Sequence, residues 1–424
     1  MSDQSSSFSA PRGTRDLLPP ESWRWQRVFD LALNGVFGPA GYAPMDTPIF
    51  EHTEVFERGV GEASEVVTKQ MYTFEDRGGR SLTLRPEATA GIVRAVLENR
   101  LDKGSLPVKL LSWGPMFRQE RPQKGRYRQF AQIDIEAIGS EGPAIDAEII
   151  ELAARFLRET GVECRLLLNS IGHVDETCRL GYLKALVGYL RTHENELAPE
   201  DRSRIDDNPL RAFDSKEEPT IEVMKGAPAI TDHLCNDCMR HFDEVRRLLD
   251  SLSVDHSVDP TLVRGLDYYT RTAFEFVSDD LGAQATVLGG GRYDGLAESL
   301  GGAHLPGIGF AVGVDRLLLA SRTLKEWEPR HVAVFVVALG DRAKSEALPL
   351  VTELRRAGVG ADWDLMGRGL KGQMKAADRS GARWAAIMGE EEVDAGEVTL
   401  RDLASGEQQR VRGADLLNLL QAKE

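Results

Sequence analysis

The sequence predicts an α+β core that is interrupted by a helical insertion and followed by a small α/β domain. Three observations support this fold class. Residues 110–140 show two strand patterns joined by a long basic loop, and residues 170–256 are charged, largely helical in pattern and broken by prolines. Beyond residue 330, strand-like and helix-like segments alternate, which is typical of an α/β domain.

The composition is that of an ordinary soluble globular protein. The chain has 424 residues, enough for two or three domains, of which 42% are hydrophobic and 28% charged. No apolar run approaches the length that spans a bilayer, and the polar start MSDQSSSFSAP lacks the basic and apolar regions of a secretory signal. Four cysteines do not suggest a disulfide framework at this size. We therefore expect a cytoplasmic protein without a membrane segment.

Periodicity and breaks at proline and glycine define the elements. A helix signal begins after Pro19-Pro20, and TLRPEATAG at 83–91 marks a strand that meets a helix, because Pro86 disfavours helical geometry before it. The best linker candidate is 324–330. The other signals are, in chain order, an amphipathic helix over 141–160, strands over 262–277, 284–289 and 307–313, a helix over 314–323, and helices over 342–357 and 370–379.

Positive charge is concentrated in two stretches of this acidic chain. The net charge of −15 argues against non-specific coating of nucleic acid, but local patches decide whether phosphates bind. The stretch 117–128 holds five cations against Glu120, and the stretch 368–383 holds five against Asp378. Both stretches are therefore candidate phosphate-binding surfaces.

The second arm of the predicted hairpin alternates polar and apolar residues. Residues two apart in a strand share a face, so Ile133, Ile135 and Ala137 lie opposite a polar row. From Gln132 to Glu136 this polar row covers about 13 Å, which is long enough to bind a nucleotide at one end and a small molecule at the other. A solvated sheet face with a flexible charged loop is the alternative. The row consists of Phe130, Gln132, Asp134 and Glu136.

Two further clusters, and the lack of a nucleophile, narrow the chemistry. LVRGLDYYTRTAFEF at 262–276 places two tyrosines after an Arg-Gly turn, although core and edge aromatics would give the same pattern. VLGGGRYDGL and PGIGFAVGVDRLLLA contain glycines that let a strand pass close to something flat. The sequence has no Gly-Lys dipeptide, hence no P-loop, and suggests no Ser-His or Cys-His nucleophile. Arginines, carboxylates and glycines favour phosphorus chemistry by positioning and charge stabilisation.

Several of these stretches resemble known motifs. GPMFRQERPQKGRYRQFAQIDIEAIG resembles motif 2 of class II aminoacyl-tRNA synthetases, GIGFAVGVDRLLL resembles motif 3, and PRGTRDLLP with FGPAGYAPMDTPIFE resembles the N-terminal entry and motif 1. RGLDYYTRTAFE and GGRYDGL resemble two histidine signature peptides, whereas the class I signatures HIGH and KMSKS are absent. Over essentially its whole length the chain resembles the histidyl-tRNA synthetase family.

This resemblance implies a domain organisation and a reaction. It implies a class II catalytic domain over 1–325 with a mixed, mainly antiparallel sheet, a helical insertion over about 170–258, and an anticodon-binding α/β domain over 331–424. The implied enzyme is an ATP-dependent ligase that forms histidyl-adenylate from L-histidine and transfers histidine to the 3′ end of tRNA(His). Mg²⁺ on the outer phosphates, a homodimer formed through motif 1, and anticodon recognition by the second basic stretch are also implied.

For ATP, the resemblance implies five residues of the hairpin and of motif 3. Arg118 would hold the α-phosphate, Glu120 the adenine amino group and Arg126 the outer phosphates. Phe130 and Arg316 would stack on the two faces of the adenine, the arginine as a cation over a π system.

For histidine, the resemblance implies a pocket that contacts both ends of the amino acid. Ala88 replaces an expected glycine in this pocket and Asp134 replaces a smaller residue, with no role assigned to the added charge. Arg264 would lie near the α-phosphate and the carboxylate, where other class II enzymes use a second metal, and it and Arg118 are the predicted catalytic residues. Glu87, Thr89 and Gln132 would bind the α-ammonium group, Glu136 and Tyr268 the imidazole, and Tyr269 would close the pocket.

Two other functions fit parts of the pattern. A histidine-sensing regulatory paralogue usually lacks the C-terminal domain and loses motif arginines, whereas 331–424, Arg118, Arg264 and Arg316 are all present here. A synthetase for another amino acid, such as proline or threonine, would have no reason to carry RGLDYYTRT.

One stretch raises the question of a metal. HLCNDCMRH places His233, Cys235, Cys238 and His241 close together. A single C-x-x-C with flanking histidines on a helical stretch is more often part of a core and a surface, and a second ligand pair at the usual spacing is missing. We therefore expect no metal site made by protein side chains.

Overall fold

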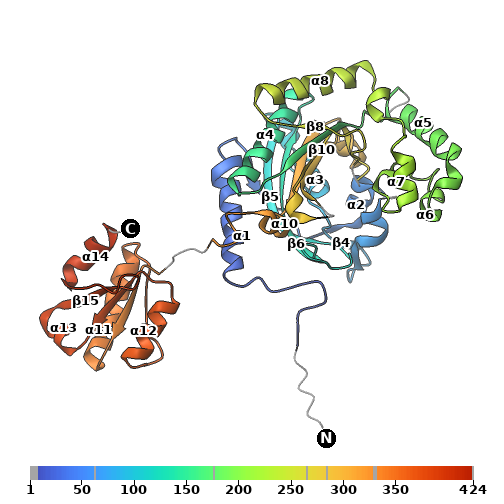
Figure 1. The fold of residues 1–424 in the computed structure, drawn as a ribbon. Helices are drawn as coiled ribbons and strands as arrows, with labels where there is room; N and C mark the ends of the chain where they lie inside the picture. The colour runs from blue at the N-terminus through green and yellow to red at the C-terminus, as the bar shows by residue number, and fades with distance from the viewer. Residues whose placement is uncertain are drawn as a thin grey trace, which may run out of the picture. The chain divides into compact units, whose positions relative to one another are not determined.

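The computed structural model describes residues 8–61, 64–174, 177–263, 266–282, 285–327 and 332–422, with the backbone alone at residue 214. The chain divides into two compact units, Met1–Trp327 and Glu328–Glu424, each described by itself (Figure 1). The boundary falls within the stretch 324–330. Among the described helices, none is long and apolar enough to cross a membrane.

The first unit is built on an eight-stranded mixed sheet. Its order is β1-β5-β6-β11-β10-β9-β7-β8; the pairings from β5 to β7 are antiparallel, while β1 and β8 join the two ends in parallel. The predicted mixed, mainly antiparallel sheet is confirmed. The strands are β1 (Ala43–Met45), β5 (Val108–Phe117), β6 (Gln129–Ile138), β7 (Arg165–Ser170), β8 (Ser257–Val258), β9 (Thr270–Val277), β10 (Thr286–Arg292) and β11 (Gly307–Gly313).

The predicted hairpin forms the centre of this sheet. β5 and β6 pair in one continuous register, from Val108 opposite Ile138 to Phe117 opposite Gln129. Apolar residues on one face of β6 join the main core, to which helix α4 (Pro143–Glu159) also contributes. The period of two therefore sends one face of β6 into the core and leaves the polar face for a site.

Helices and a small sheet surround the core. α1 (Glu21–Asp30) continues as a π-helical stretch over Leu31–Phe37, and α10 (Val314–Ala320) follows β11 directly. Helix α3 (Thr89–Glu98) begins at the predicted strand–helix junction. The remaining elements are the sheet β2-β4-β3, formed by β2 (Phe50–His52), β3 (Tyr72–Glu75) and β4 (Ser81–Leu84), and helices α2 (Thr53–Val60) and α9 (Leu296–Ser299).

The helical insertion lies between β7 and β8; in Figure 1 its helices α5, α6 and α7 lie together at the side of the sheet, whereas α8 runs beside α4. Helices α5 and α7 share a second apolar core that also takes in Tyr269 and Ala273. Helix α8 instead packs into the main core through Phe242, Val245 and Leu249. The insertion is thus anchored at both ends. Its helices are α5 (Arg179–Thr192), α6 (Pro199–Arg202), α7 (Glu218–Met224) and α8 (Asn236–Ser251).

The second unit is the predicted α/β domain with its own sheet. The order is β13-β12-β14-β15-β16, with β13, β12 and β14 parallel and the last two strands antiparallel. Residues of β12 alternate between two apolar clusters, as expected for a strand covered on both faces. The elements are β12 (Val334–Ala338), α11 (Asp341–Arg356), β13 (Ala361–Trp363), α12 (Leu370–Arg379), β14 (Trp384–Met388), α13 (Glu390–Ala395), β15 (Glu397–Asp402), β16 (Gln408–Arg412) and α14 (Gly413–Gln421).

Candidate active site

The polar face of β6 is buried inside the first unit. Gln132 is 9% exposed, and Asp134 and Glu136 are each 1% exposed. On the opposite face, Ile133 and Ile135 belong to the main core. The alternative of a solvated sheet face is therefore wrong for this strand, and its buried polar groups need another explanation.

The start of α3 lies against the carboxylate end of this face. Glu87 accepts hydrogen bonds from the backbone N–H groups of Thr89 (3.0 Å) and Ala90 (2.9 Å), and Ala88 is the N-cap residue. The first N–H groups of a helix have no intrahelical partner, which makes this a favourable place for a carboxylate. Thr89 Oγ1 donates to Glu136 Oε1 at 2.7 Å. The fold therefore brings these predicted histidine-site residues together.

Two tyrosines donate to these carboxylates, and a third packs against one of the two. Tyr268 Oη donates to Glu87 Oε2 at 3.4 Å, and its ring centroid lies 4.6 Å from that of Tyr269. Tyr293 Oη donates to Glu136 Oε2, and this tyrosine is 1% exposed. The sequence placed Tyr293 in GGRYDGL without a role, because no local pattern shows where its ring points.

Glycines on the neighbouring strand β11 make room for these side chains. Gly309 lies opposite Glu136 in the β6–β11 pairing, and a Cβ at Gly309 would lie 1.7 Å from Glu136 Oε2. A Cβ at Gly307 would lie 2.2 Å from the ring of Tyr293. The space left by the missing Cβ atoms is therefore filled by Glu136 and Tyr293, which are side chains of the site itself.

The segment before β9 differs from its prediction. The strand expected over 262–277 begins only at Thr270, because the chain ahead of it turns: the Asp267 backbone N–H donates to the carbonyl of Val60 in α2 at 3.1 Å. After that turn Tyr268 reaches Glu87, whereas Tyr269 joins the apolar core of the insertion. Arg264, a predicted catalytic residue, lies outside the described residues.

Three buried carboxyl groups share the site. Burial raises the pKa of Glu87, and it raises the pKa of Asp134 and Glu136 well above the ordinary range, with repulsion from neighbouring carboxylates adding to the rise for the latter two. Among the described residues, Gln132 Oε1 and Asp134 Oδ2 are buried without a hydrogen-bond partner. The site therefore has an excess of buried acceptors, which a cationic ligand with several N–H donors would satisfy.

Arginines from the hairpin loop line the other half of the site. Arg118 Nε donates to the carbonyl of Pro86 at 2.8 Å, and Arg118 Cζ lies 5.4 Å from the ring centroid of Phe130. Carboxylate oxygens of Glu120 lie 3.9 Å from a guanidinium nitrogen of Arg118 and 3.4 Å from one of Arg126. One guanidinium beside an aromatic ring, and a second near the same glutamate, suit a purine nucleotide and its phosphates.

Arg316 reaches this loop from α10. Its Nε and Nη2 donate to the carbonyl of Thr286 at 2.8 and 2.6 Å, which fixes the guanidinium. A Cβ at Gly125 in the loop would lie 3.6 Å from Arg316 Cγ. Burial and then repulsion from Arg126 lower the pKa of Arg316 from its ordinary value. The predicted ATP residues thus come from one hairpin and from the helix that meets its loop.

The residues of HLCNDCMRH do not form one cluster. His241 Nε2 lies 2.8 Å from Asp146 Oδ2, and the ring of His233 lies 5.6 Å from that of a tyrosine in α5. The two cysteines lie instead beside His173 and Cys178, which come much earlier in the chain. The four residues of this stretch therefore do not share one site, as expected from the sequence. The sequence could not show the two partners of the cysteines, because local spacing does not reveal which distant residues the fold adds.

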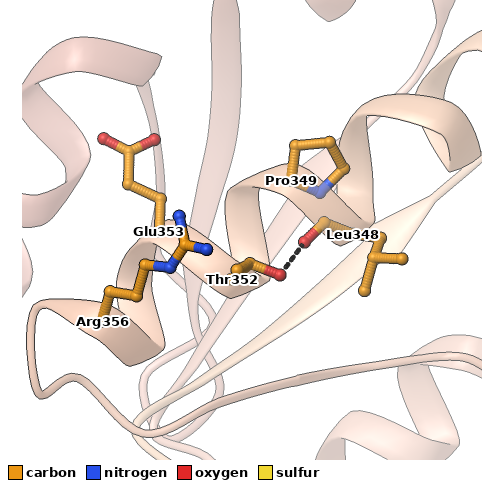
Figure 2. A pocket seen from close by; sticks show the side chains of 5 residues that line it. All are labelled: Leu348, Pro349, Thr352, Glu353 and Arg356. Carbon is orange, nitrogen blue, oxygen red and sulfur yellow. Dashed lines mark hydrogen bonds between the residues drawn. The ribbon is translucent and has the colours of Figure 1, made fainter.

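A surface hollow of about 570 Å³ lies in the second unit. Figure 2 shows that its lining side chains, Leu348, Pro349, Thr352, Glu353 and Arg356, all come from α11. The hydrogen bond drawn there, from Thr352 Oγ1 to the carbonyl of Leu348 at 2.8 Å, stays within the helix. Side chains on one helix face do not converge on a ligand, so we place no site there.

The chain matches known proteins over nearly its full length. Residues 13–317 match the family model described as "Histidyl-tRNA synthetase", and residues 333–423 match "Anticodon binding domain". A histidine–tRNA ligase of Halothermothrix orenii is 47% identical over 97% of this chain and 98% of its own, and one of Corynebacterium kroppenstedtii is 49% identical over 95% and 94%. The crystal structure of apo histidyl-tRNA synthetase of S. aureus has a TM-score of 0.80 at 36% identity, over 98% of this chain and 100% of that one. On these matches, the chain belongs to the histidyl-tRNA synthetase family.

Proposed function

We propose that this member of the family carries out both steps of histidine–tRNA ligation on the polar face of β6. In the first step a carboxylate oxygen of L-histidine attacks the α-phosphorus of ATP, the bond to the β-phosphate breaks, and pyrophosphate leaves. In the second step a hydroxyl of the terminal ribose of tRNA(His) attacks the histidyl carbonyl, and AMP leaves. Neither step needs a protein nucleophile, so the residues act through position and charge.

The excess of buried acceptors is the observation that carries the assignment of histidine to this face. An α-ammonium group brings three N–H donors, and an imidazole brings one or two. We assign the ammonium to Glu87, Thr89 and Gln132, because Gln132 Oε1 has no partner among the described residues. Asp134 lies next along the same face, its Oδ2 also lacks a partner in the described part of the chain, and we assign it as a further acceptor for that ammonium.

We assign the imidazole to Glu136, which two hydroxyl groups hold in place. Thr89 and Tyr293 each donate to a different carboxylate oxygen of Glu136. Each oxygen keeps a further lone pair that can accept from a ring N–H. We assign Tyr268 as the second group that contacts the imidazole, with Tyr269 packed against it. A site built to satisfy buried polar groups rejects amino acids that lack the matching N–H.

MgATP is the second substrate in this proposal. We assign the α-phosphate to Arg118, whose guanidinium is anchored on the Pro86 carbonyl, and the outer phosphates to Arg126. The adenine lies between Phe130 and Arg316 with its amino group at Glu120. Mg²⁺ would enter the site bound to the outer phosphates of ATP, with phosphate oxygens and water as most of its ligands. Arg264 is assigned to the junction of carboxylate and α-phosphate from the family resemblance.

For tRNA, we propose that the domain over 331–424 reads the anticodon with one face of α12. Lys371, Lys375 and Arg379 are exposed and four residues apart, so they lie on the same side of the helix. Arg368 contributes less, because its Nη1 already pairs with Asp364 at 2.8 Å. Cations in such a row suit the phosphates of a bound nucleic acid.

We further propose a cytoplasmic homodimer whose interface lies near β1 and β2, the strands within and at the end of the motif 1 stretch. The apolar side chains of Ile49, Phe50 and Phe74 are 45%, 53% and 43% exposed, and the two phenylalanine rings lie 6.5 Å apart. A cluster of this kind suits a surface that is covered in an assembly. Light scattering during size-exclusion chromatography should give the mass of a dimer; a monomer at micromolar concentration would contradict the assignment.

Histidine-dependent ATP–pyrophosphate exchange tests the function. The purified chain should exchange pyrophosphate with L-histidine and not with proline or threonine, and it should then charge tRNA(His). A histidine-sensing regulatory protein of the same fold would bind histidine without exchange, and that result would overturn the proposal.

A further inference from the structure

Four potential metal ligands from three separate segments meet beside the main sheet. One ligand atom from each lies within 4.8 Å of the others. His173 follows β7, Cys178 directly precedes α5, and a Cys-x-x-Cys pair spans the N-terminus of α8, where Cys235 is the N-cap residue. The cluster therefore connects the first and last helices of the insertion, α5 and α8, which are labelled in Figure 1. Its members are His173, Cys178, Cys235 and Cys238.

The four side chains already face one another. His173 Nδ1 lies 2.9 Å from Cys238 Sγ and 3.7 Å from Cys235 Sγ. The backbone N–H of Cys235 donates to Cys178 Sγ at 3.0 Å, and the backbone N–H of Cys238 donates to Cys235 Sγ at 3.5 Å. Zinc binds cysteine as the thiolate and histidine through a ring nitrogen, and both kinds of atom are turned toward one another here. Gly172, with a φ of 64°, lets the chain leave β7 in the direction that places His173 here.

We propose that His173, Cys178, Cys235 and Cys238 bind one structural Zn²⁺ in a tetrahedral Cys₃His site. Zinc takes thiolate sulfur at about 2.3 Å and imidazole nitrogen at about 2.0 Å, which separates tetrahedral ligand atoms by about 3.5–3.8 Å. The observed separations bracket that range, so the ion needs only small side-chain shifts. Soft thiolates with one imidazole select zinc over magnesium, calcium or manganese.

The donor set indicates a structural role for the ion. Four protein ligands leave no open coordination position for a substrate. Cys178 and Cys238 are buried, whereas His173 and Cys235 are half-buried. The ion therefore enters from one side and is then enclosed by the ends of two helices. Because the ligands come from three segments, its binding energy stabilises the docking of the insertion on the core.

The zinc would also support the tyrosine segment of the active site. Arg179, the residue after Cys178, donates from Nη1 to the carbonyl of Tyr269 at 2.8 Å. Gly172 and Ile171 exchange backbone hydrogen bonds with Arg271, at 2.8 and 2.7 Å. The segment that carries Tyr268 and Tyr269 is thus hydrogen-bonded to residues next to two of the four ligands: Gly172 precedes His173, and Arg179 follows Cys178. The zinc site itself does not depend on the proposed function.

Metal analysis of the untagged, full-length chain tests the proposal. After gel filtration under reducing conditions, elemental analysis should find about one zinc per chain, with X-ray absorption showing sulfur near 2.3 Å. Cys235→Ser and Cys178→Ser should lose the zinc. Cys164→Ser is the matched control: Cys164 is a free, half-buried cysteine packed against the main core outside the cluster, so this variant should keep the zinc.

A measurement on the wild-type chain keeps the test independent of whether the serine variants fold. Co²⁺ added to the chelator-stripped protein should give the visible bands of a tetrahedral thiolate site, and Zn²⁺ should displace them. Three results would overturn the proposal: a reduced chain with no stoichiometric zinc and no such cobalt spectrum, unchanged zinc in folded Cys235→Ser, or a disulfide between these cysteines in the freshly isolated protein.

Discussion

Replacing Glu136 by glutamine should separate histidine recognition from stability. The substitution keeps the side-chain shape and removes one buried negative charge. A charge-assisted hydrogen bond to an imidazole N–H contributes about 1.5–3 kcal/mol, so kcat/KM for histidine should fall by about 10–150-fold. The KM for ATP should change little, because Phe130 lies about 20 Å away along β6.

The same substitution should not destabilise the fold. Burial raises the pKa of Glu136 well above its ordinary range, so the folded chain disfavours the charge. When the folded pKa of an acid lies above its unfolded pKa, the stability it contributes is fully present below the unfolded pKa and is lost as pH rises through the folded pKa. Glutamine does not ionise, so the variant does not lose this stability as pH rises. The Tm of Glu136→Gln should therefore equal or exceed that of the wild type, with a difference that grows as pH rises.

Histidine-dependent pyrophosphate exchange and melting curves over a pH series measure both effects. Glu148→Gln is the matched control, because Glu148 is a half-buried carboxylate on α4 that pairs with Lys109 at 2.5 Å outside the polar face of β6, so its loss should leave both readouts nearly unchanged. Tyr293→Phe is the companion variant: it removes a donor to Glu136 while keeping the charge, so it should lower both activity and Tm. A near-normal kcat/KM for histidine in Glu136→Gln, or a large fall in its Tm, would refute the placement of the imidazole.

Three further changes test other parts of the account. Gly309→Ala should raise the KM for histidine more than that for ATP, because its Cβ would lie 1.7 Å from Glu136 Oε2; equal effects on both substrates would count against this. Arg264→Ala should slow single-turnover adenylate formation by about 10²–10³-fold with an unchanged Tm, and Arg264→Lys should recover only part of the rate, because an ammonium is a point charge rather than a fork. A wild-type rate, or loss through unfolding alone, would end that assignment. A chain that ends at Arg330 should still form adenylate but charge tRNA(His) with a raised KM, and an unchanged KM would remove the second unit from tRNA binding.

Local periodicity accounts for what could be predicted from the sequence. The alternation within β6 is enough to place Ile133 and Ile135 on one face of the strand and Gln132 and Glu136 on the other. The structure shows the same two faces. The junction before α3 was likewise marked by a proline and by its flanking residues. The burial of the polar face was not predictable, because it depends on elements far away in the chain.

Contacts between distant segments account for what was missed. Tyr293 and Glu136 are 157 positions apart, and no pattern around GGRYDGL shows that its tyrosine donates to that carboxylate. His173 and Cys238 are 65 positions apart, on either side of most of the insertion. In the sequence, the histidines nearest to Cys235 and Cys238 are His233 and His241. In the fold, the two cysteines lie beside His173 and Cys178 instead.

A crystal structure of the chain with bound L-histidine would show whether the polar face of β6 binds the amino acid, and in which orientation. An imidazole N–H should lie within hydrogen-bond distance of Glu136, and the α-ammonium group should lie beside Glu87 and the Oε1 atom of Gln132. Histidine bound in the opposite orientation, with its ammonium at Glu136, would contradict this assignment, as would histidine bound away from this face of β6.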